Sequence, residues 1–110
     1  MSSVLHFPEK EIMKEYLSKH EGLNFSYYKN HGITKAIIDL AADKLAGARI
    51  LDHAIEPLSL KMIAELRCGK DSFSGEPLPN LSKLGLHEMM WGQIAITVEQ
   101  ALIDCGKNAS

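Results

Sequence analysis

The sequence predicts an all-α protein: a single domain that forms a small irregular or orthogonal bundle of about four helices. Apolar residues recur at helical spacing in four segments, and strand-like alternation is confined to one short stretch. The four segments differ in length, which is untypical of a regular up-and-down bundle. A chain of 110 residues has the length of one domain, so residues 1–110 are assigned to it.

The N-terminal segment, residues 1–7, is predicted to dock as an arm. Residues 4–7 alternate in polarity before Pro8, so a short edge strand is the alternative. The first helix should begin at Pro8, because the fixed φ of proline suits the first helical position, and end near His20 and Gly22. Its predicted apolar stripe consists of Ile12, Met13, Tyr16 and Leu17.

The second helix is predicted to run from residue 33 or 34 to residue 55, where Pro57 stops it. In the stretch 45–48 around Gly47, small side chains cover nearly every side of the predicted helix. Either another helix packs closely there or the helix breaks there, and we favour close packing, although glycine disfavours a helix interior. A short third helix should then begin at residue 58 or 59 and end at Cys68.

Two segments are predicted to be loops. Residues 24–32 mix aromatic and polar side chains, and we expect an ordered loop there. Residues 69–80 contain two glycines and two prolines, which disfavour regular structure. This long loop carries Phe73 and Leu78 as isolated apolar residues, so it is a candidate contact surface.

The last helix is predicted to begin between residues 81 and 87 and to end near Cys105. Gly106 should stop it, which leaves residues 106–110 as a frayed tail. Its core-facing stripe spans a broad arc of the helical wheel. The stripe consists of Met90, Trp91, Ile94, Val98, Ala101, Leu102 and Cys105.

A second apolar stripe lies beside the first on this helix. Met89, Ile96 and Ile103 are spaced seven residues apart. Because one face is enough to join a helix to its own core, a second stripe indicates a second contact. That contact is either another helix of the same chain, which we favour, or a second copy of the protein. With Phe73 and Leu78, these three residues form the candidate interface.

Charge and composition disfavour several classes of protein. The net charge is −2, and basic residues are interleaved with acidic ones, which is untypical of a nucleic-acid binder. A helix-turn-helix register built on Ala64 would put Gly75, Pro77 and Pro79 into the recognition helix. We expect neither a membrane span nor a leader. Two cysteines are too few for a disulfide scaffold and are typical of a reducing cytoplasm.

Metal and cofactor sites are not predicted. No two of the five histidines are three or four residues apart, and the two cysteines are far apart in sequence. Asp39 and Asp43 share a helix face and could hold Mg²⁺. Lys35 precedes Asp39 by four residues, however, so we favour a solvated ion pair over a metal site.

Nucleophilic chemistry has few candidates. Cys105 falls in the core stripe, and Cys68 lies at a helix C-terminus, where the dipole would disfavour a thiolate. Lys44 is the unusual residue, because it lies near the centre of an apolar face. A buried lysine can act as a base or nucleophile. We favour the alternative that its stem reaches the surface, or that a break at Gly47 moves it there.

The sequence therefore predicts a small cytoplasmic interaction or regulatory protein that acts by binding another protein and by self-associating. This function needs no cofactor and no catalytic residue. A DNA-binding transcriptional regulator is the alternative from a different class, and a small helical enzyme comes third.

Overall fold

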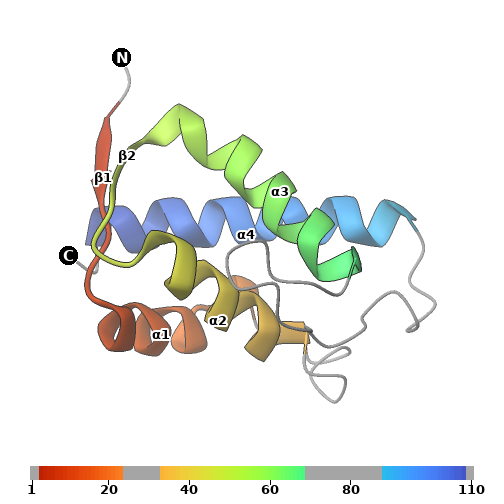
Figure 1. Cartoon of the computed structure of the whole chain (residues 1–110), viewed down its shortest axis with the longest axis horizontal. Helices are drawn as coiled ribbons and strands as arrows, with labels where there is room; N and C mark the ends of the chain where they lie inside the picture. The colour runs from red at the N-terminus through yellow and green to blue at the C-terminus, as the bar shows by residue number, and fades with distance from the viewer. Residues whose placement is uncertain (1–2, 24–32, 69–87, 109–110) are drawn as a thin grey trace.

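The computed structural model describes residues 3–23, 33–68 and 88–108. Within these ranges, four α-helices make up most of the molecule and confirm the predicted all-α bundle. Figure 1 shows the longest helix running the length of the molecule, with the other three at varied angles to it. The first and third helices contact the longest helix, and the second helix contacts the first and the third. The helices are α1 (Lys10–Lys19), α2 (Ile33–Leu45), α3 (Ile55–Cys68) and α4 (Glu88–Asn108).

The N-terminal segment forms a strand, so the prediction of a docked arm was wrong. Strand β1 (Val4–His6) pairs antiparallel with β2 (Arg49–Leu51), with Leu5 opposite Ile50. The alternation seen in the sequence has a physical cause: Leu5 is fully buried, and its neighbours on either side face outward.

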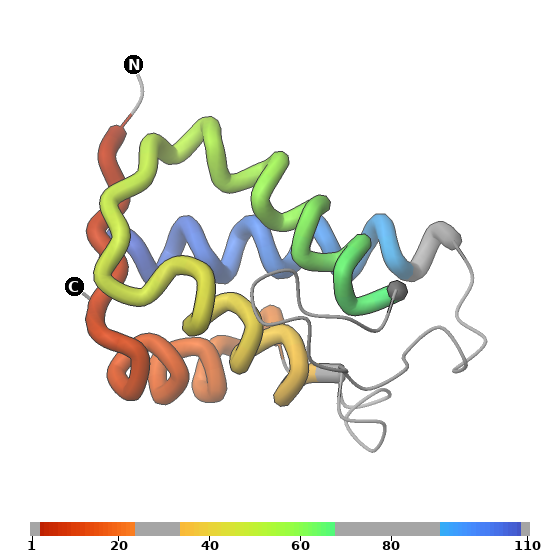
Figure 2. The backbone as a smooth tube through the Cα atoms, in the orientation of Figure 1, coloured from red at the N-terminus to blue at the C-terminus, as the bar shows by residue number. Residues whose placement is uncertain are grey.

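The chain breaks at Gly47, which corrects the prediction of one helix from 33 to 55. Gly47 has a φ of +74°, the left-handed conformation that commonly ends a helix. Its N–H donates to the carbonyl oxygen of Pro8 at 2.9 Å, and the N–H of Phe7 donates to Ala48 at 2.9 Å. Figure 2 shows the resulting turn between α2 and α3. The small residues at 45–48 therefore mark a break rather than a helix crossing.

Pro57 lies in the first turn of a helix instead of ending one. After β2, the 3-10 helix η3 (Asp52–Ala54) leads directly into α3, which starts at Ile55. Pro57 lies in the first turn of α3, where no N–H is needed for intrahelical bonding. The third helix is consequently longer at its N-terminus than predicted.

The first helix lies close to its predicted position. Glu9 is the N-cap and His20 the C-cap, so the helix starts two residues after Pro8. Met13 and Leu17 are buried as expected, whereas Ile12 is 46% exposed. A short 3-10 helix, η1 (Glu21–Leu23), follows and packs on α4.

The core-facing stripe of α4 is confirmed for the residues whose side chains the structure describes. These are Trp91, Ile94, Val98, Ala101, Leu102 and Cys105, all buried. Gly106 does not stop the helix, which continues to Asn108, so 106–108 are not a frayed tail. The predicted loops at 24–32 and 69–80, with Phe73 and Leu78, lie outside the described residues.

Candidate functional site

Lys44 is buried in an ion pair, which corrects the preference for a surface position. Its ammonium lies 3.1 Å from Oε1 and 3.0 Å from Oε2 of Glu65. The two side chains are 6% and 11% exposed, and they join α2 to α3. The ammonium is held by the carboxylate of the neighbouring helix and is almost fully shielded from solvent, so it is not presented to a ligand. We therefore assign this pair a structural role.

Asp39 and Asp43 are engaged by lysines, as the solvated interpretation predicts. Lys35 lies 2.7 Å from Asp39, and Lys14 from α1 lies 3.5 Å from the same carboxylate. Lys10 lies 2.6 Å from Asp43. Hydrogen bonding to Asp43 and its negative charge raise the pKa of Lys10, and Asp39 raises the pKa of Lys35 in the same way. Within the described ranges, no cluster of three metal-ligating side chains forms.

A groove of about 820 Å³ runs between α1 and α2. Its two hydroxyl groups are already used as donors: Ser18 donates to the Glu15 carbonyl at 2.8 Å, and Thr34 donates to the Leu23 carbonyl at 3.1 Å. Charges of both signs alternate along it, so it presents no single field to a ligand. The lining residues are Glu11, Lys14, Glu15, Ser18, Thr34, Lys35, Ile38 and Asp39.

His20 and Asp104 form a contact that the sequence did not reveal. His20 Nε2 lies 2.9 Å from Asp104 Oδ2, and the N–H of Gly22 donates to His20 Nδ1 at 3.1 Å. Because Nδ1 accepts, Nε2 carries the hydrogen and donates to Asp104. Both ring nitrogens are thus occupied within the protein, so this pair fastens the C-terminal end of α1, just before η1, to α4 rather than providing a general base. The two residues are 84 positions apart, and no local pattern connects them.

Cys105 is a buried core residue, as predicted. Burial raises the pKa of its thiol to about 11. The thiolate is the reactive form of cysteine, and it is therefore suppressed at neutral pH.

Two large aliphatic side chains stand exposed on the neighbouring helices α3 and α4. Leu60 is 53% exposed and Ile96 is 60% exposed. With Ala64 and Gly92, which are also exposed, they define what we call the α3/α4 face. The helices are tied together beneath this face, because the Ser59 hydroxyl donates to the Ala95 carbonyl at 2.6 Å.

A groove of about 250 Å³ is lined in part by Leu60, Ala64 and Gly92, and Ile96 follows Gly92 by one helical turn on α4. At one end, the Arg67 guanidinium lies 5.6 Å from the centroid of the Trp91 ring, which is almost fully buried. At Gly92, an added Cβ would meet no atom within 4 Å. The fold therefore does not require a glycine at this position. The groove is lined by Leu60, Ile63, Ala64, Arg67, Trp91, Gly92 and Ala95.

The predicted second stripe of α4 divides between surface and core. Ile96 lies on the surface, whereas Ile103 is half-buried and packs against the core. The side chain of Met89 lies outside the described residues. Leu60 is exposed on α3, and no sequence pattern indicated this exposure. The role of these residues in an interface stays a prediction.

Comparison with family models, with curated proteins and with solved structures gives no match for this chain. Among the helices that the structure describes, none has the length and apolar character needed to cross a membrane.

Proposed function

We propose that this protein acts by binding another protein through the α3/α4 face, as an interaction or regulatory module without a catalytic residue or cofactor. The observation that supports this proposal is the exposure of Leu60 at a largely apolar groove, with Ile96 exposed one helical turn beyond Gly92, which also lines the groove. Exposed aliphatic side chains grouped around a groove are typical of protein-binding surfaces. Other exposed aliphatic side chains, Val4, Ile12 and Leu51, lie on the sheet and on α1.

The charge distribution also favours a protein partner over nucleic acid. In the described part of the chain, several lysines form ion pairs with carboxylates, so their charge is balanced locally. Binding to a phosphate backbone requires an excess of basic charge on one face. The paired lysines are Lys10, Lys14, Lys19, Lys35 and Lys44.

The cysteine content supports a reducing compartment. Cys105 is a free thiol buried in the core, and the whole chain has two cysteines. We therefore assign the proposed function to the cytoplasm.

Site-specific photo-crosslinking in cells tests this proposal. A photoreactive side chain at position 96 should yield a discrete protein adduct, and the same group at position 12 serves as the matched control. Ile12 is a suitable control because it is also aliphatic, helical and 46% exposed. We expect Leu60→Glu to reduce the adduct from position 96 by about tenfold, since a charge in an apolar contact is costly. Equal adducts from both positions, unaffected by Leu60→Glu, would overturn the proposal.

A further inference from the structure

We infer that the partner at the α3/α4 face is a second copy of this chain, docked about a two-fold axis with the two α3 helices antiparallel. This inference rests on the proposed function and specifies its partner. It is carried by the order of charges along α3.

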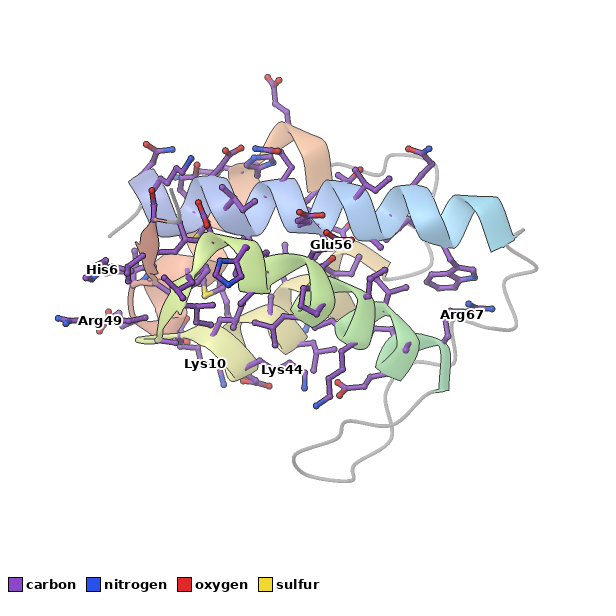
Figure 3. The ribbon with its side chains drawn as sticks, turned by 90° about the horizontal axis from the view of Figure 1, so that it is seen from above. His6, Lys10, Lys44, Arg49, Glu56 and Arg67 are labelled. Atoms are coloured by element: carbon purple, nitrogen blue, oxygen red, sulfur yellow. The ribbon has the colours of Figure 1, made fainter. Side chains whose placement is uncertain are left out.

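One stripe of α3 carries opposite charges at its two ends, with Glu56 and Leu60 exposed and Arg67 half-buried. Glu56, Leu60 and Arg67 are separated by four and seven residues, so they lie on one side of the helix. The carboxylate stands in the first turn and the guanidinium in the last, about 16 Å apart along the axis. Figure 3 shows Glu56 over the junction of α3 and α4 and Arg67 toward the far end of α3.

This order of charges is complementary to itself when the second copy runs antiparallel. In a two-fold dimer, residue i of one copy meets residue j of the other, and j meets i. Glu56 of each copy therefore meets Arg67 of the other, which gives two ion pairs per dimer. Leu60 lies between the charged ends and close to the axis. A parallel arrangement would instead oppose Glu56 to Glu56 and Arg67 to Arg67.

The centre of the face suits a close approach of two helices. Ala64 and Gly92 are small and exposed, and the adjoining groove of about 250 Å³ is open to an aliphatic side chain. A second copy brings its own Leu60 and Ile96 to this position. Arg67 can keep its contact with the Trp91 ring while it binds a carboxylate, because a guanidinium has five donors and a separate stacking face.

A charge exchange tests this geometry on the full chain by light scattering during size-exclusion chromatography. The wild type should approach a mass of about 24 kDa as its concentration rises, twice the 12.2 kDa of one chain. Glu56→Arg and Arg67→Glu should each weaken dimerisation by about tenfold or more, because each variant opposes like charges at both contacts. An equimolar mixture of the two variants should restore the dimer, since both contacts again join opposite charges.

Lys61→Glu is the matched control for charge reversal. Lys61 is exposed on α3 but outside the stripe, so its variant should dimerise as the wild type does. Circular dichroism checks that each variant is folded. Should Arg67→Glu fail to fold, Ala64→Glu and Ala64→Lys provide the same test near the axis: each alone should dissociate, and their mixture should dimerise.

The outcomes separate this inference from the proposed function. A wild-type mass of about 12 kDa at every concentration overturns the second copy as partner, while the crosslink from position 96 still tests binding to a different protein. A wild-type dimer whose complementary variants do not restore each other overturns the antiparallel geometry. Recovery in the mixture, with Lys61→Glu unchanged, supports the inference.

Discussion

Gly106 and Leu5 hold β1 directly against α4. A Cβ atom at position 106 would lie 2.6 Å from the Cβ of Leu5 and 3.3 Å from the ring of Phe7. Real Cβ atoms do not approach so closely, so the glycine permits this contact. It also explains why a glycine stands inside a helix that continues to Asn108.

Gly106→Ala should lower the free energy of unfolding by about 1–3 kcal/mol, because the clash involves a Cβ near the backbone rather than a mobile side-chain end. Urea denaturation measures the change. Gly92→Ala is the matched control on the same helix: its added methyl group meets open space, and it should stabilise the monomer by about 0.5–1 kcal/mol. Equal stability of Gly106→Ala and wild type would contradict the close approach.

Breaking the Lys44–Glu65 pair should be strongly destabilising. Lys44→Met or Glu65→Met alone leaves a buried charge without its counter-ion, and we expect a loss of about 3–5 kcal/mol. The double variant Lys44→Met/Glu65→Met removes both charges and should recover most of that loss. Guanidinium unfolding of the four proteins gives the coupling energy. Additive losses would show that the two side chains do not interact.

His20 should be held in the tautomer with hydrogen on Nε2. The Gly22 N–H occupies Nδ1, and Asp104 accepts from Nε2. Nitrogen-15 NMR of the ring at about pH 8 distinguishes this tautomer from the other. Asp104→Ala should lower the free energy of unfolding by about 1 kcal/mol. Gln100→Ala, which removes another contact of Asp104, should cost less because it is exposed. A ring protonated at Nδ1 would contradict the arrangement.

The free energy of unfolding should decrease at alkaline pH, in part because of the buried thiol of Cys105. Burial raises the pKa of this thiol from 9.0 to about 11, so between these values the unfolded chain loses the proton while the folded chain retains it. The contribution is fully present below pH 9.0 and is lost as the pH rises to about 11, with a size of roughly 2–3 kcal/mol. Unfolding of the wild type and of Cys105→Ala at several pH values isolates it, because the variant lacks this decline. Parallel pH profiles would refute the assignment.

Helical periodicity was sufficient to predict α1 and the core stripe of α4. Met13 and Leu17 on α1 are buried where the pattern placed them, and so are the stripe residues of α4, namely Trp91, Ile94, Val98, Ala101, Leu102 and Cys105. These elements follow local rules, because each presents one apolar face to the core. The bundle class could therefore be predicted from the sequence.

The local sequence could not show that the helix breaks at Gly47, because the structure that follows the break is stabilised by a segment far along the chain. The residues after Gly47 form β2, whose hydrogen-bonding partner is β1. The small side chains around Gly47 suit a helix crossing equally well. The choice between these structures depends on strand pairing across more than forty positions, which no short pattern encodes.

The surface was harder to predict than the core for a similar reason. Leu60 belongs to the helical pattern of apolar residues in α3, yet α4 does not cover it and its side chain is exposed. Lys44 was placed correctly on an apolar face, but its partner Glu65 belongs to another helix, so its buried state was missed. In both cases the helix was predicted, and its rotation relative to a neighbour decided the outcome.

The pairing of β1 with β2 has a consequence for the order of folding. During synthesis, β1 leaves the ribosome long before β2, and longer still before the residues around Gly106 that cover Leu5. Contacts so distant along the chain close slowly, because the loop entropy is lost before the contact is gained. The nascent chain therefore carries an unpaired strand until β2 emerges, and an uncovered Leu5 until its last helix emerges. That strand is where a chaperone or a neighbouring nascent chain would first attach.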